Sequence, residues 1–141
     1  MPYWREMPAT TEQIREILDA ETVAVVGCST TPGKAAHDVP KYLLDRGYEV
    51  IPVNPYADEV FGIEAYDSLT EVPEGVDVAD VFRPSEETGP IVDAAIERDD
   101  VTAIWLQLGI RNDAAGERAE AAGKLFVQDR CIKVEHAKLV A

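Results

Sequence analysis

Short, uninterrupted runs of apolar residues alternate along this chain with longer stretches whose apolar residues recur every three or four positions. The uninterrupted runs are rich in β-branched residues, which is typical of strands buried on both faces of a parallel sheet. Five such strands are predicted, over residues 22–26, 48–53, 76–82, 102–108 and 124–128.

The stretches between these strands have helical periodicity. Helices are predicted over about 36–46 and 88–98, from Asn112 or Asp113 to Gly123, and over 132–139. A first helix begins near Thr10, because Thr10 and Gln13 have the spacing of a capping box, as do Ser68 and Glu71 further along the chain. Residues 58–66 read as an irregular excursion with room for a short strand pair.

Strands that alternate with helices of this length predict an α/β fold, namely a doubly wound, five-stranded parallel sheet. We expect one domain over residues 1–141, in which residues 1–21 form an N-terminal helical lead-in. The predicted strand order is 3-2-1-4-5. A ligand is then expected at the carboxyl ends of the strands, between the first and the fourth.

The negative net charge of the chain excludes some classes of binding partner. The 141 residues include 27 acidic and 13 basic residues, for a formal net charge of −14. Such a surface repels nucleic acid and anionic membranes, so neither is an expected partner, and the evenly spread acidic excess resembles that of halophile proteins. No apolar run is long enough to span a bilayer, and the first residues lack the order of a signal peptide, so a cytoplasmic location is predicted.

The cysteines and histidines do not indicate a metal site. Cys28 and Cys131 are far apart in sequence, and neither His37 nor His136 is spaced with them as a zinc ligand would be. We therefore expect no structural metal and no disulfide between the two cysteines.

The turn after the first strand carries the strongest chemical signal. Gly27 ends the apolar run, Ser29, Thr30 and Thr31 supply hydroxyls, and Lys34 supplies a cation just before a predicted helix. Free N–H groups and the positive end of a helix dipole suit a pyrophosphate there, although the dinucleotide fingerprint G-x-G-x-x-G is absent.

The residue after the second strand helps to choose between nucleotides. NAD-binding domains usually place an acidic residue at this point, whereas this chain has Asn54 followed by Pro55. Asparagine does not repel a phosphate, which disfavours NAD and allows NADP or coenzyme A. Asn54 is equally compatible with a simple turn before proline.

Several segments together resemble the coenzyme A-binding domain family, which is similar to the CoA-binding domain of the succinyl-CoA synthetase alpha subunit. These segments are VAVVGCS, HDVPKYLLDRGYEVIPVNP, VDVADVFR, IWLQLGIRN and DRCIKVEH, between about Val23 and His136. The resemblance implies a Rossmann-like fold and a small-molecule nucleotide ligand, CoA or an acyl-CoA, bound across the strand ends. The residues that it implies for binding are Gly27, Cys28, Ser29, Thr30 and Lys34 near the phosphates, Asn54 and Pro55 at the adenosine end, and Phe82, Arg83, Gln107 and Gly109 along the rest of the groove.

The chain departs from the usual family pattern at three places. Ala36 stands where the family commonly has serine, Ile132 where it has proline, and Arg83-Pro84 where it has two basic residues. One phosphate-binding hydroxyl is therefore missing.

No catalytic constellation is visible, so the sequence predicts a non-catalytic protein that binds CoA or an acyl-CoA. Two alternatives remain open. One is an NADP-dependent oxidoreductase domain, and the other is a CoA-linked thiol switch through Cys28 or Cys131, because a cysteine at a helix N-terminus can have a lowered pKa.

Overall fold

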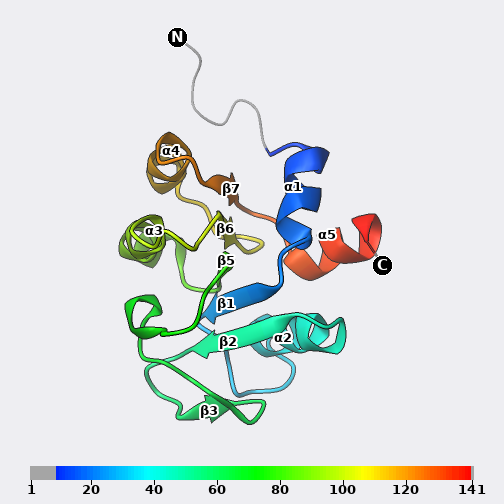
Figure 1. Cartoon of the computed structure of the whole chain (residues 1–141). Helices are drawn as coiled ribbons and strands as arrows, with labels where there is room; N and C mark the ends of the chain where they lie inside the picture. The colour runs from blue at the N-terminus through cyan, green and yellow to red at the C-terminus, as the bar shows by residue number, and fades with distance from the viewer. Residues whose placement is uncertain (1–8, 141) are drawn as a thin grey trace.

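A five-stranded parallel sheet is the centre of the computed structural model, which describes residues 9–140 (Figure 1). Across the sheet, the strands are β2 (Glu49–Val53), β1 (Thr22–Val26), β5 (Val78–Val81), β6 (Ala103–Leu106) and β7 (Leu125–Val127). A separate antiparallel hairpin consists of β3 (Glu59–Val60) and β4 (Ile63–Glu64). The predicted Rossmann-like α/β fold with five parallel strands is thus confirmed.

Helices cover both faces of the sheet, as Figure 1 shows. One face carries α1 (Thr11–Leu18), α2 (Ala35–Asp45) and α5 (Ile132–Leu139), and the other carries α3 (Thr88–Ile96) and α4 (Asp113–Ala121). Two short 3-10 helices, η1 (Leu69–Glu71) and η2 (Ser85–Glu87), lie in the connections that flank β5.

Alternate residues of each strand divide the core into two layers. In β1, Ala24 and Val26 pack in the layer under α3 and α4, whereas Val23 and Val25 pack in the layer under α1, α2 and α5. Because each strand is buried on both faces, its sequence is an uninterrupted apolar run, which is the pattern that predicted the strands.

Side chains cap two of the predicted helices. The Thr10 hydroxyl accepts from the backbone N–H of Gln13 in a complete capping box, and Asn112 caps α4 by accepting from Ala115. The second predicted capping box is wrong, because Ser68 makes no side-chain cap bond to the backbone of η1. Its hydroxyl instead donates to the carboxylate of Glu71, at 3.1 Å.

The predicted strand order needs one correction. The third strand of the main sheet, β5, does not lie at the edge beside β2 but between β1 and β6, so the order is 2-1-3-4-5 in the same numbering. All five apolar runs look alike, and hence the hydrophobic pattern does not specify which strands are neighbours. The winding reverses between β1 and β5, which moves the expected ligand crevice to the ends of these two strands.

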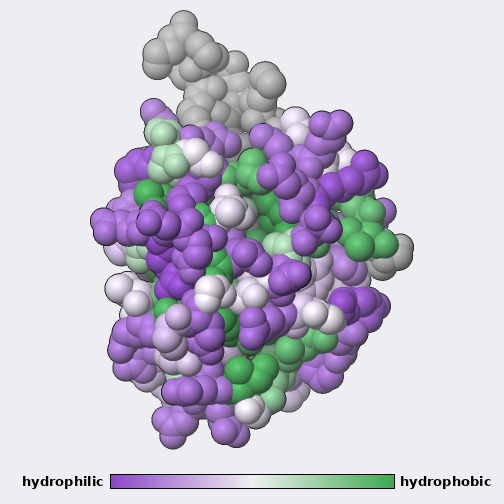
Figure 2. Space-filling view, viewed as in Figure 1, coloured by the Kyte–Doolittle hydropathy of each residue, from purple (hydrophilic) through white to green (hydrophobic). Residues whose placement is uncertain are grey.

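The outer surface is mainly hydrophilic on the face shown in Figure 2, with hydrophobic residues visible in patches between the polar ones. This appearance agrees with the net charge of −14. Within residues 9–140, no helix has the length and apolar character needed to cross a membrane. Of the predicted N-terminal lead-in, residues 11–18 form α1, and residues 1–8 lie outside the described part.

Candidate functional site

A groove of about 710 Å³ lies at the carboxyl ends of β1, β2 and β5. It occupies the place where the winding of the sheet reverses, and this is where open α/β sheets bind their ligands. Eight of the residues predicted from the sequence line it, namely Gly27, Cys28, Ser29, Lys34, Asn54, Pro55, Phe82 and Arg83.

Gly27 begins the loop between β1 and α2, and two constraints require glycine there. Its φ is +89°, in the region that residues with a side chain rarely adopt. A Cβ atom at this position would lie 3.0 Å from Cδ of Arg83 and 3.2 Å from the carbonyl oxygen of Phe82. The end of β5 can therefore approach the loop closely only because residue 27 has no side chain.

The remainder of this loop is ordered by backbone hydrogen bonds before it enters α2. The N–H of Ser29 donates to the carbonyl of Ala36 at 2.9 Å, and the N–H of Gly33 donates to the Asp38 carboxylate at 3.1 Å. Lys34 is the N-cap residue of α2 and makes no side-chain cap bond. Because the first N–H groups of a helix have no partner within it, the start of α2 offers donors to an anion.

Asn54 ties this loop to the connection after β2. Its Nδ2 donates to the carbonyl of Cys28 at 2.9 Å, while its Oδ1 accepts from the backbone N–H of Tyr56 at 2.8 Å. Asn54 is therefore a turn former, as one interpretation of the sequence had it, and also a brace between two walls of the groove. Its contact with a ligand stays a prediction.

Charges of both signs line the groove. Lys34 is exposed, and its ammonium group has no ion pair or hydrogen bond among residues 9–140. Arg83 is held by Glu87, since Nη2 and Nε of the guanidinium lie 2.8 and 3.3 Å from Oε1 of the carboxylate. Lys34 is thus the cation most readily available to an anionic ligand, and Glu87 competes for the other one.

Three predicted residues do not line the groove. Thr30 is exposed in the loop. Gln107 is only 4% exposed, and its Oε1 accepts from the backbone N–H of Ile132 at 3.2 Å. Gly109 donates its N–H to the Asp129 carboxylate at 2.7 Å. A role for these three residues in binding stays a prediction.

The back wall of the groove was not foreseen. It comes from the connection between β2 and β5 and from α3, through Asp67, Leu69, Thr70, Ile91 and Ala94. Tyr56, at the start of this connection, also lines the groove but is exposed. Ile91 lies in the stretch 88–98 whose periodicity predicts a helix, but this pattern does not point to a groove. No sequence signal marks the others, because they reach the groove through a long connection with little regular structure.

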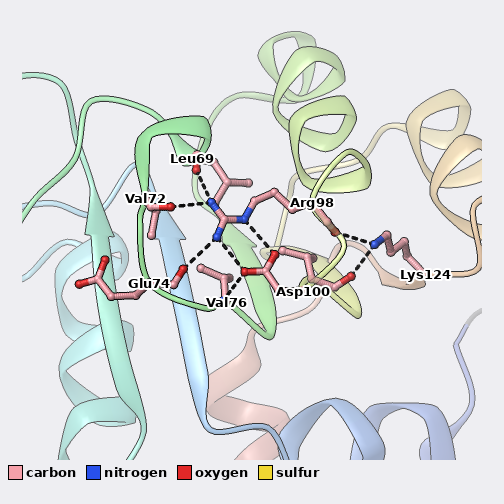
Figure 3. A network of polar contacts seen from close by, with 8 residues as sticks. Leu69, Val72, Glu74, Val76, Arg98, Asp100 and Lys124 are labelled. Atoms are coloured by element: carbon pink, nitrogen blue, oxygen red, sulfur yellow. Dashed lines mark hydrogen bonds and ion pairs between the residues drawn. The ribbon is translucent and has the colours of Figure 1, made fainter.

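Arg98 fixes this back wall in place, as Figure 3 shows. Its guanidinium donates to the carbonyls of Leu69, Val72 and Glu74, each at 2.9 Å, and binds the Asp100 carboxylate with Nη2 at 2.8 Å. These bonds hold the segment from η1 to β5 against the end of α3. The hydrogen bond from Arg98 is also the main reason why the pKa of Asp100 falls from 3.8 to about 2.

Lys124 extends the same network from the other side of Arg98 (Figure 3). Its ammonium group donates to the carbonyl oxygens of Arg98 and Val101, at 2.8 and 2.7 Å. The turn after α3 is therefore held between two basic side chains, one of which reaches the wall of the groove.

Burial argues against an activated thiol at Cys28. Cys28 is fully buried, and this burial, assisted by the nearby carboxyl of Asp80, raises its pKa to about 12. The lowered pKa expected for a thiol switch at this position is wrong, because Cys28 packs in the core layer under α1, α2 and α5. Both cysteines are free thiols, and the ends of β1 and β7 are separated by two intervening strands.

Asp80 is the unusual group beneath this site. It lies in β5 between Val25 of β1 and Trp105 of β6, and its two carboxyl oxygens have no hydrogen-bond partner within residues 9–140. Complete burial raises the pKa of this carboxyl group well above its usual range. Among the described residues, no cluster of three or more His, Cys, Asp or Glu side chains could hold a metal ion.

This chain is similar to other proteins over nearly its whole length. The Bacillus subtilis (strain 168) protein YneT is 40% identical over 126 residues, which cover 89% of this chain and 93% of YneT. A hypothetical protein from Pyrococcus horikoshii OT3 superposes with a TM-score of 0.90 at 37% identity, and the match covers 100% of both chains.

Larger enzymes contain a similar region. The ADP-forming acetate–CoA ligase of Methanocaldococcus jannaschii is 34% identical over 73 residues, which are 52% of this chain but only 10% of the ligase. The family model described as a CoA binding domain matches residues 21–137. That range includes the whole groove and all five strands of the main sheet, and the chain therefore belongs to the CoA binding domain family.

Proposed function

We propose that this protein binds coenzyme A or an acyl-CoA in the groove at the ends of β1, β2 and β5, and that it does so without catalysing a reaction. The observation that carries the proposal is the Gly27 turn, which lines the groove together with Lys34 and Ala36 at the start of α2. In a member of the CoA binding domain family, this arrangement suits the phosphates of CoA.

The described residues fit such a ligand in three zones. Gly27, Cys28 and Ser29 form the turn beside the phosphates, and Lys34 adds a positive charge. Asn54 and Pro55 border the adenosine. Phe82 and Arg83 face the middle of the groove, from which the pantetheine arm continues toward Gln107 and Gly109 at the end of β6.

A binding role without catalysis is supported by two observations. The likeness to the M. jannaschii ligase is limited to a tenth of that enzyme. In addition, the thiol nearest the proposed phosphate site, Cys28, is buried and has a raised pKa, so it is a poor nucleophile.

Thermal unfolding with a panel of nucleotides tests the proposal. CoA at a hundred times its dissociation constant is expected to stabilise the protein by about 2.7 kcal/mol. For a domain of this size, this corresponds to a rise in Tm of roughly 10 °C. NAD and NADP are expected to leave Tm unchanged. A rise with NAD or NADP and none with CoA would overturn the proposal.

Lys34 and Glu87, two charged residues that line the groove, should have opposite effects on affinity. Lys34→Ala removes a charge-assisted contact and is expected to weaken CoA binding roughly ten-fold in low salt, with a smaller loss as salt screens the charge. Glu87→Gln releases Arg83 and removes a negative charge, so CoA should bind about two- to five-fold more tightly. Isothermal titration at two salt concentrations measures both changes.

Comparison of the two variants also distinguishes a direct contact between Lys34 and the ligand from the general effect of the protein's net charge. If only the net charge of −14 mattered, both variants would shift affinity weakly, Lys34→Ala downward and Glu87→Gln upward by a similar factor. Equal and opposite changes in CoA affinity, or an unchanged affinity for Lys34→Ala in low salt, would mean that the phosphates do not bind beside Lys34.

A further inference from the structure

Tyr56 is an aromatic residue left open at the mouth of the groove. It is 95% exposed, more than any other large hydrophobic residue in the described part of the chain, and it lines the groove. Its side chain makes no hydrogen bond or ring contact within residues 9–140. Folding therefore gains almost nothing from the ring, although a smaller polar residue would serve the turn as well.

The backbone of Tyr56 is nevertheless held in a fixed relation to the loop after β1. Its N–H donates to Oδ1 of Asn54, and the same side chain reaches the carbonyl of Cys28 through Nδ2. The two hydrogen bonds, of 2.8 and 2.9 Å, connect the turn that carries the ring to the turn that begins with Gly27. The turn proposed for the phosphates and the turn that carries the ring therefore line the same groove as neighbours.

Apolar side chains also contribute to the lining of the groove. Leu69 of η1, with Ile91 and Ala94 of α3, lines the same groove as Tyr56. Flat heterocycles bind in such places, because one face can pack on aliphatic groups while the other stacks on an aromatic ring. A pantetheine arm is flexible and has no ring, so it gains less from a tyrosine.

We propose that the ring of Tyr56 stacks on the adenine of the bound nucleotide and thereby selects for an adenine-containing ligand. This inference rests on the proposed CoA-binding function and adds to it a residue that determines specificity. The affinity comes from ring stacking, so the tyrosine hydroxyl is not required.

Titration calorimetry with three probes tests the inference, using CoA, adenosine 3′,5′-bisphosphate and 4′-phosphopantetheine. Tyr56→Ala is expected to weaken the first two probes by the same factor, roughly 5- to 100-fold, and to leave 4′-phosphopantetheine unaffected. Tyr56→Phe keeps the ring and should stay within about two-fold of the wild type. Val134→Ala, which truncates an exposed apolar side chain on α5, is the matched control and should leave all three affinities unchanged.

A spectroscopic readout gives direct evidence of stacking. The adenine H2 and H8 resonances are expected to move upfield when the ligand binds the wild type, and this shift should be lost in Tyr56→Ala and kept in Tyr56→Phe. An unchanged CoA affinity in Tyr56→Ala, or an equal loss for 4′-phosphopantetheine, would overturn the role of Tyr56 while CoA binding itself stands. If the wild type binds none of the probes, the proposed function is wrong, and the inference fails with it.

Discussion

Replacing Arg98 with alanine is expected to destabilise the protein by about 2–4 kcal/mol, because one side chain satisfies three backbone carbonyls and a carboxylate. The side chain of Arg98 is only 16% exposed, so water replaces these bonds poorly when the guanidinium is removed. The melting temperature should fall by roughly 10 °C, as measured by thermal or chemical unfolding.

Arg118→Ala is the matched control for this experiment. Arg118 also binds a carboxylate at 2.8 Å, that of Asp93, but both side chains are about half exposed. Exposed ion pairs contribute at most about 1 kcal/mol, so this variant should melt close to the wild type. Similar losses in Arg98→Ala and Arg118→Ala would mean that the backbone carbonyls gain little from Arg98.

The pH dependence of stability provides a second test of the Arg98 network. The pKa of Asp100 is lowered in the folded protein from 3.8 to about 2, chiefly by the hydrogen bond from Arg98. The stability that this carboxylate contributes is present above pH 4 and is lost as pH falls from about 4 to 2. In Arg98→Ala, the loss of stability between about pH 4 and 2 that is due to Asp100 should disappear.

Local pattern was sufficient to predict most of the fold. The strand that ends at Val26, the capping box at Thr10 and the cap at Asn112 each depend on residues close together in the sequence. The order of the strands depends on which apolar runs pair, and β5 pairs with β1 through contacts between residues more than 50 positions apart. Hydrophobic periodicity carries no information about such pairings.

The same distinction applies to the candidate site. Gly27 and Lys34 lie in the turn between a strand and a helix, where local sequence indicates an anion site. The back wall depends on Arg98, which brings Leu69 and its neighbours to α3 from 29 positions away. The raised pKa of Cys28 likewise reflects burial and the neighbouring Asp80, a residue 52 positions later in the sequence. Neither the back wall nor the raised pKa of Cys28 can be predicted from local sequence, because both depend on contacts between distant parts of the chain.

Gly27→Ala is expected to lower both stability and the affinity for CoA, because the added methyl group meets backbone that cannot move aside easily. Alanine at a φ of +89° is strained, and its Cβ would lie 3.2 Å from the Phe82 carbonyl oxygen and 3.0 Å from Cδ of Arg83. Together, strain and crowding should cost about 2–3 kcal/mol of folding free energy. The end of β5 must then shift away from the loop, which displaces the backbone that the proposed phosphate site needs.

Gly47→Ala is the control that distinguishes steric crowding of the added methyl group from backbone strain at a positive φ. Gly47 has a φ of +94°, and no atom lies within 4 Å of a Cβ built there, after the end of α2 and away from the groove. This variant should lose only the cost of strain, about 1 kcal/mol, and should bind CoA as the wild type does. We expect Gly27→Ala to unfold at a lower denaturant concentration than Gly47→Ala and to bind CoA at least ten-fold more weakly in titration calorimetry. If the two variants matched in stability and both bound CoA normally, the close approach of β5 to the Gly27 turn would have no part in ligand binding.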